Sequence, residues 1–176
     1  PAPDGAAALV LCAEHVCRAS AEQPIKVLAS VQTSGAPQIA KHRDLSTFEA
    51  TVRAAQQAYL AAGIQAAQVD VVELHDCFSM AEIIDSEDLG VVPRGQGAIW
   101  AAEGRTDVRG DVAINPSGGL LAKGHPVGAT GVGQVYEVVR QLRGEHSNQV
   151  ADARIGMTHN LGGTGVACTV NIMQAS

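Results

Sequence analysis

The sequence predicts an α/β fold with a mixed, mostly parallel sheet covered by helices. Predicted strands alternate with predicted helices, whose apolar residues recur at helical spacing. The order along the chain is β, β, α, β, α, β, α, β, β. The last two runs, residues 155–158 and 166–172, are joined by a short glycine-rich link. That link predicts an antiparallel pair at one edge of the sheet.

The first two predicted strands lie on either side of a polar segment. Residues 5–11 form a short, continuous apolar run, which is typical of a buried strand. Residues 25–31 alternate apolar and polar side chains and predict a second strand. The polar stretch 14–24 between them is the expected boundary between two parts of the chain.

Two helices are expected to begin at S-x-x-E sequences, in which the serine and glutamate side chains cap the first turn. Ser46 and Glu49 open the first helix, which extends to Gly63, a residue suited to a left-handed C-terminal cap. Ser79 and Glu82 open the second, shorter helix.

The remaining elements surround a loop and a glycine-rich run. Residues 69–74 predict a central strand and 112–114 a brief one, with a loop expected at 91–110. A glycine-rich run over 118–133 leads into a helix that Gly144 ends.

Composition argues against several classes of protein. The chain has 176 residues, 46% of them hydrophobic and 17% charged, which suits one globular domain and argues against disorder. No apolar run approaches the length of a membrane-spanning helix. The formal net charge of −6 and the lack of a basic stripe argue against nucleic acid and anionic membranes as primary partners.

The four cysteines do not suggest a disulfide framework or a zinc ribbon. They stand at Cys12, Cys17, Cys77 and Cys168, with no C-x-x-C pair and no repeated spacing. This pattern favours a reduced setting inside the cell, and we expect a cytoplasmic protein.

Three polar segments, each with a histidine, follow predicted strands. They are residues 75–78, 115–131 and 159–165. Because ligand sites of open α/β sheets gather at the carboxyl ends of the strands, these segments are expected to meet in one active site.

One cysteine and two histidines are the first candidates for chemistry. Cys77 lies between a strand and a helix, where the helix N-terminus and a nearby imidazole favour a thiolate; the alternative is a structural thiol. His125, beside Pro126, could take a proton from a nucleophile or donate to an oxyanion, or could merely hold a loop. His159 opens the last glycine turn, whose N–H groups could face a ligand; the alternative is an exposed hairpin residue.

A zinc site is another way to use these residues. Its ligands would be His75, Cys77, His125 and His159. Structural zinc sites usually draw their ligands in close pairs, and Gly-His-Pro is a poor rigid ligand arm, so we expect no resident metal.

Five segments carry a resemblance to a known family. They are residues 4–11, 73–79, 114–120, 123–131 and 159–163, which read DGAAALVL, ELHDCFS, INPSGGL, KGHPVGATG and HNLGG. Together they resemble the thiolase superfamily, and best match its sterol-carrier-protein-2 type, a group of lipid-transfer and acetyl-CoA acetyltransferase proteins. The resemblance implies that residues 1–20 end the N-terminal thiolase half with its last strand, and that residues 21–176 are the thiolase C-terminal domain.

The resemblance also implies a role for each segment. Cys77 would be the acid/base thiol, and His75 would replace a loop asparagine that helps to build an oxyanion hole. His125 would activate the nucleophilic cysteine and bind the thioester oxygen, and His159 takes the position of a cysteine in commoner thiolases. The substrate-binding and oxyanion loops would contain Asn115, Gly124, Pro126, Gly162 and Gly163.

The implied chemistry is acyl transfer on acyl-CoA thioesters, either 3-ketoacyl-CoA thiolysis or acetyl-CoA condensation. Coenzyme A would be a substrate, and no cofactor would be bound permanently. The family's nucleophile lies in the N-terminal half. We therefore expect that half as a partner, in cis or as a separate subunit, together with homo-oligomerisation and no activity of residues 1–176 alone.

Two alternatives stay open at this point. One is a steroid side-chain aldolase of the lipid-transfer-protein group, against which Cys77 argues because those enzymes depart from His-Asp-Cys-Phe. The other is a non-catalytic acyl-CoA or lipid-binding protein on a thiolase scaffold. Cys77 and His125 argue against it, whereas the absence of the family's nucleophile argues for it.

Overall fold

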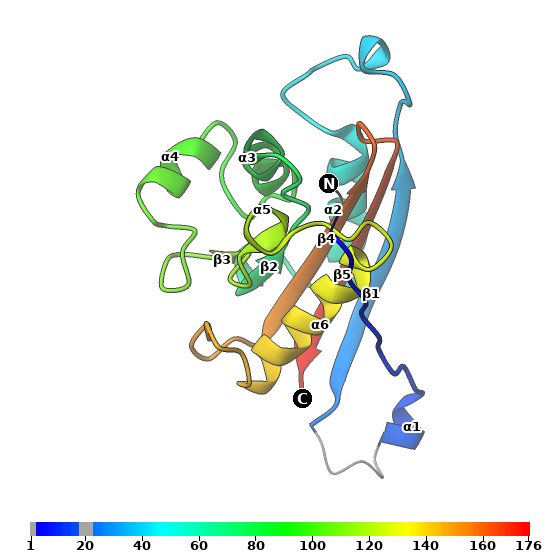
Figure 1. Cartoon of the computed structure of the whole chain (residues 1–176), viewed down its shortest axis with the longest axis vertical. Helices are drawn as coiled ribbons and strands as arrows, with labels where there is room; N and C mark the ends of the chain where they lie inside the picture. The colour runs from blue at the N-terminus through cyan, green and yellow to red at the C-terminus, as the bar shows by residue number, and fades with distance from the viewer. Residues whose placement is uncertain (1–2, 18–22) are drawn as a thin grey trace.

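The structure is a computed structural model that describes residues 3–17 and 23–176. Its sheet consists of β1 (Ile25–Ser34), β2 (Val71–Glu73), β3 (Ala113–Ile114), β4 (Ile155–Gly162) and β5 (Ala167–Ala175). The strands lie in the order β1-β5-β4-β2-β3 (Figure 1). β3, β2 and β4 are parallel neighbours, whereas β5 is antiparallel to both β4 and β1. The predicted α/β class with a mixed sheet is confirmed, and the antiparallel part includes two strand pairs.

Helices cover both faces of this sheet. The described helices are α1 (Glu14–Cys17), α2 (Glu49–Ala62), α3 (Ser79–Asp88), α4 (Gly97–Ala102), α5 (Gly119–Lys123) and α6 (Thr130–Arg143), with 3-10 turns at Ile39–Lys41 and Ala66–Gln68. Those that pack on the sheet are chiefly α2 and α6, whereas α1 has no buried residue. Val72 packs in the core cluster that includes α2, whereas its neighbour Val71 packs in the cluster that includes α6. Since successive strand side chains point to opposite faces, α2 and α6 lie on opposite sides of the sheet. Within the described ranges, no helix is long and apolar enough to cross a bilayer.

Residues 5–11, where the sequence predicts a strand, form no strand in this structure. These residues lie outside the sheet, with Val10 93% and Leu11 79% exposed. A strand needs a partner backbone, and the described strands provide none for this segment. The polar boundary predicted at 14–24 falls partly on α1 and partly outside the described residues.

The two predicted capping boxes are also wrong. α2 begins after Phe48, whose N–H donates to the Asp88 carboxylate at 2.6 Å. Ser46 instead turns back to Asp44, which accepts its N–H at 2.8 Å and its hydroxyl at 2.7 Å. α3 follows Phe78 without a side-chain cap. A carboxylate from a neighbouring helix thus satisfies an N-terminal donor that the local sequence was expected to satisfy. The C-terminal caps at Gly63 and Gly144 are confirmed, because both have left-handed backbone angles.

Two short helices lie where the sequence predicted only loops. α4 interrupts the expected loop at 91–110, and α5 interrupts the glycine-rich run. Each begins against a distant carboxylate. Glu87 accepts the Gly97 N–H at 2.8 Å, and Asp76 accepts the Leu120 N–H at 2.7 Å. Negative charge at a helix N-terminus stabilises it, so these helices depend on tertiary contacts that local sequence does not show.

We expect the isolated chain to associate with itself. Apolar surface outside both core clusters is exposed at two places. One is Val10 and Leu11 in the N-terminal segment, and the other is Tyr136 on α6. Exposed apolar groups favour contact with another molecule over contact with water. Sedimentation at micromolar concentration should show a dimer or larger species, and Leu11→Lys should shift the distribution toward the monomer. A single species of 18.1 kDa would contradict this expectation.

Candidate active site

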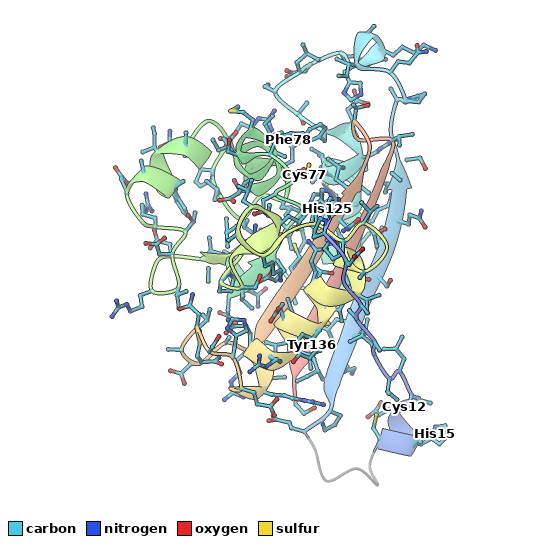
Figure 2. All side chains as sticks on the ribbon, viewed as in Figure 1. Cys12, His15, Cys77, Phe78, His125 and Tyr136 are labelled. Atoms are coloured by element: carbon cyan, nitrogen blue, oxygen red, sulfur yellow. The ribbon has the colours of Figure 1, made fainter. Side chains whose placement is uncertain are left out.

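The structure brings the three predicted segments together at one edge of the sheet (Figure 2). The rings of His75 and His125 meet edge to face, with centroids 4.9 Å apart and planes at 87°. The His75 N–H points at Nδ1 of His159, 3.5 Å away. Asn115, directly after β3, accepts the Leu74 N–H at 2.8 Å through its side-chain oxygen. The carboxyl ends of parallel strands meet at this edge, as expected for an open α/β sheet.

His125 is held as a base. Its Nδ1 lies 2.7 Å from the Thr130 hydroxyl, which donates to the Pro126 carbonyl at 3.1 Å. Because that hydroxyl gives its hydrogen to Pro126, it accepts from Nδ1–H of His125. The proton therefore sits on Nδ1, and Nε2 keeps a lone pair with which it can accept a proton.

Two polar atoms of the site are buried without a protein partner. Within the described residues, His75 Nδ1 and Asn115 Nδ2 make no hydrogen bond, and neither does Asp85 Oδ2 deeper in the core. Burial raises the pKa of the Glu82 carboxyl, and the Asn115 side chain acts on it in the opposite direction. A buried polar atom without a partner is costly, so such atoms in a site are free to bind a ligand. Burial and the neighbouring His125 lower the pKa of His75 to about 4, so the ring is neutral at pH 7.

Cys77 keeps its proton, contrary to the expected thiolate. It is half-buried, and burial is the largest cause that raises the pKa of its thiol. The negative charge of Asp85 is the next cause and raises the pKa further. Backbone N–H groups at the start of α3 act in the opposite direction but are outweighed. A neutral thiol at this position can donate a proton, and its conjugate thiolate is a strong base.

His159 does not lie in the last turn. It is a residue of β4 with 0% exposure, so the exposed-hairpin alternative is wrong. Its Nε2 is 3.1 Å from the Thr51 hydroxyl and 3.5 Å from Asp85. Burial and His75 lower the pKa of this ring to about 3, so it is neutral at physiological pH. In this structure the ring contacts Thr51, Asp85 and the main chain of His75.

The glycines of the predicted loops mark turns around the site. Gly124 ends α5 with φ +90°, next to His125 and Pro126. Gly162 closes β4, and Gly163 turns the chain toward β5 with φ +58°. Glycine adopts these positive angles at little cost, so the two turns keep their shape.

Sequence reasoning missed the residues that anchor the loop after β3. Glu73, 1% exposed at the end of β2, accepts the Ser117 hydroxyl at 2.6 Å and its N–H at 3.1 Å. Lys123 donates to the same hydroxyl at 2.7 Å and lies 3.7 Å from Glu73. The signal was present, because Glu73 is an acidic residue flanked by the apolar Val71, Val72 and Leu74 in the predicted strand.

The backbone beside this anchor has no room for a side chain at one position. Gly119 has φ +60°, and a Cβ there would lie 2.0 Å from Asp76 Oδ2. Glycine therefore lets α5 approach the carboxylate that accepts its N-terminal N–H groups.

The zinc alternative has no geometric support. In the part of the chain that the structure describes, no three side chains of the metal-binding types form a group that could hold an ion. This covers His75, Cys77, His125 and His159, which all lie within that part.

We expect the rings of His75 and His159 to stay neutral from pH 8 down to pH 5. Their pKa values, about 4 and about 3, lie below this window because burial disfavours the charged form. The ¹⁵N and ¹³C ring resonances in a pH titration check this. An exposed histidine, with an ordinary pKa of about 6.5, should titrate within the same window and serves as the control. Titration of His159 above pH 5 would contradict the burial on which the prediction rests.

The fold and the site together define an α/β domain with a mixed sheet and with histidine and cysteine groups near the strand ends. The sequence profile of the family described as "Thiolase C-terminal domain-like" matches residues 31–175, and the chain belongs to this family. It is 48% identical over 173 residues to the acetyl-CoA acetyltransferase of Methanothermobacter thermautotrophicus, covering 98% of this chain and 45% of that protein. It is 39% identical over 168 residues to human sterol carrier protein 2, covering 92% of this chain and 31% of that one.

A solved structure shares the fold. The "Ltp2-ChsH2(DUF35) aldolase" superposes with a TM-score of 0.83 at 24% identity, over 92% of this chain and 42% of that one. At this identity the likeness shows the fold alone. The chain spans less than half the length of each of these three proteins.

Proposed function

We propose that this chain is the C-terminal half of a thiolase-type acyltransferase that acts on acyl-CoA thioesters. One observation carries the proposal. The His125 ring, with its Nδ1 bound to Thr130, lies against His75 of the segment that carries Cys77. His75 Nδ1 and, beside this segment, Asn115 Nδ2 have no partner among the described residues. Family membership and similarity to an acetyl-CoA acetyltransferase support it. In this proposal residues 1–20 end the N-terminal half, and residues 21–176 form the C-terminal domain.

Each group has a place in the reaction. A nucleophilic cysteine of the N-terminal half gives its proton to His125 Nε2, and its sulfur attacks the carbonyl carbon of the substrate. Asn115 Nδ2 and the neutral His75 ring lie at the same edge and supply donors for the developing oxyanion. In thiolysis Cys77 then gives a proton to the leaving carbanion; in condensation its thiolate removes a proton from the acetyl group.

Coenzyme A is a substrate in this scheme, and no cofactor is resident. The turns at Gly124–Pro126 and Gly162–Gly163 border the site and are proposed to line the path of the thioester. The N-terminal half is the required partner, in cis or as a separate subunit, and the complete enzyme is proposed to be a homo-oligomer.

Thioester cleavage tests the proposal. The chain, joined to or mixed with the half that carries the nucleophile, is given acetoacetyl-CoA and coenzyme A, and acetyl-CoA is measured. We expect acetyl-CoA only when the two halves and coenzyme A are all present. Binding of acyl-CoA without cleavage would favour the non-catalytic alternative. Aldehyde or ketone release from a steroid side-chain thioester, without acetyl transfer, would favour the aldolase alternative.

A further inference from the structure

A buried chain of hydrogen bonds lies beneath the proposed catalytic groups. It joins three side chains that are each 0% exposed: Asp85 of α3, Thr51 of α2 and His159 of β4. The Thr51 hydroxyl donates to Asp85 at 2.9 Å and lies 3.1 Å from His159 Nε2. Burying polar groups is costly unless they are paired, and Asp85 Oδ2 has no partner among the described residues, so this network needs a reason beyond packing.

The directions of the hydrogen bonds assign one form of the His159 ring. A backbone N–H can only donate, so the N–H of His75 requires an unprotonated Nδ1 on His159. The neutral ring then carries its hydrogen on Nε2, which donates to the Thr51 hydroxyl. That hydroxyl can accept from His159 because its own hydrogen goes to Asp85. Only this tautomer satisfies all three contacts.

His159 in turn contacts two segments of the site. Its Nδ1 faces the main chain of His75, which begins the segment that carries Cys77. Its backbone carbonyl accepts Gln134 Nε2 of α6 at 2.9 Å, and α6 follows directly on the loop of His125. His159 therefore contacts both the segment that carries Cys77 and the helix that follows the loop of His125.

We propose that Thr51 and Asp85 are positioning residues that fix the His159 ring in its Nε2–H form, so that the ring holds the backbone that carries His75 and Cys77 in place for the reaction. Neither residue reaches the substrate. The other titratable groups that act on this network are His75, Cys77, Cys168 and Asp88. The effect on turnover rests on the proposed function, whereas the assignment of the ring does not.

Three variants of the enzyme assembled with its nucleophile-bearing half test the inference. Thr51→Val keeps the shape of the side chain but removes the hydroxyl, and Thr51→Ser keeps the hydroxyl. The matched control is Thr47→Val, which removes a similar bond of 2.8 Å to Asp88 that does not involve His159. Protein labelled with ¹⁵N-histidine reports which ring nitrogen carries the proton.

The expected results separate positioning from stability. The unaltered enzyme and Thr51→Ser should show His159 with a bare Nδ1 and an Nε2 proton that exchanges slowly with solvent. Thr51→Val should speed that exchange and lower kcat by about tenfold with little change in KM, whereas Thr51→Ser and Thr47→Val should retain most of the turnover.

Three outcomes would overturn the inference: a proton on Nδ1, unchanged Nε2 exchange in Thr51→Val, or equal turnover of Thr51→Val and Thr51→Ser. If the unaltered enzyme does not cleave acyl-CoA at all, the proposed function fails. The ring assignment and the Nε2 exchange in Thr51→Val then still decide whether Thr51 positions His159.

Discussion

Replacing Cys77 by alanine is expected to lower the turnover of the assembled enzyme by about a hundredfold or more, the range for loss of a general acid or base. The thiol lies half-buried at the strand end, with a raised pKa that keeps it protonated. In the proposed reaction its proton has to reach the substrate carbon, and alanine cannot supply one. Initial rates of acetoacetyl-CoA cleavage at saturating coenzyme A measure the effect.

His125→Ala is expected to cause a loss of similar size, because the free Nε2 accepts the proton of the nucleophile. The two variants differ in the step that they affect. His125→Ala should slow formation of the acyl-enzyme, whereas Cys77→Ala should chiefly slow proton transfer to or from carbon. Exchange of the acetyl hydrogens with deuterated water follows the second step alone.

Cys77→Ser provides the sharper test of the thiol. Serine keeps nearly the same shape but is a much weaker acid, so turnover should stay far below that of the unaltered enzyme. Near-normal turnover of Cys77→Ser would mean that the thiol is structural. Cys12→Ser is a useful comparison, because Cys12 is an exposed thiol that lies outside the proposed reaction.

The parts of the fold that could be predicted are those with a strong local pattern. The alternation at 25–31 and the apolar runs at 69–74 and 155–158 each correspond to a strand. Glycine at the ends of α2 and α6 was informative, because a left-handed cap needs that residue. The run at 5–11 has an equally clear apolar pattern but lacks a pairing strand in this structure. The pattern alone therefore did not determine whether these residues form a strand.

The elements that could not be predicted depend on contacts between distant residues. The starts of α2 and α5 depend on Asp88 and Asp76, which are 40 and 44 positions away from the N–H groups that they accept. Such contacts form only after the sheet has brought the helices together. Local propensity therefore predicted the helix α2 correctly but predicted Ser46 as its cap. In the structure Ser46 donates its N–H to Asp44 instead.

The candidate site shows the same division. Cys77, His75 and His125 could be found because each stands at a strand end or in a glycine-rich run. Thr51 and Asp85 carry no such signal, since they are polar residues within helices and lie 34 positions apart. His159 was noticed, but its place inside β4 could not be read from a turn that looks open in the sequence.

The largest loss of stability should come from Leu74→Ala. Leu74 is 0% exposed and packs in the main core cluster directly before His75, and its N–H donates to Asn115 at 2.8 Å. Removing its side chain leaves a cavity, which costs about 2–5 kcal/mol of unfolding free energy. Denaturant titration should show a lower midpoint with an unchanged slope.

Leu60→Ala is the matched control, because it makes the same chemical change on α2 at a side chain that is 85% exposed. It should alter the unfolding free energy by no more than about 0.5 kcal/mol. The cavity at Leu74 would also loosen the main chain that positions His75 and Asn115, so the variant should lose turnover even at temperatures where it stays folded. If Leu74→Ala is as stable as Leu60→Ala, the packing of the β2 strand end is not as the structure has it, and the geometry of the site built on that strand end is wrong with it.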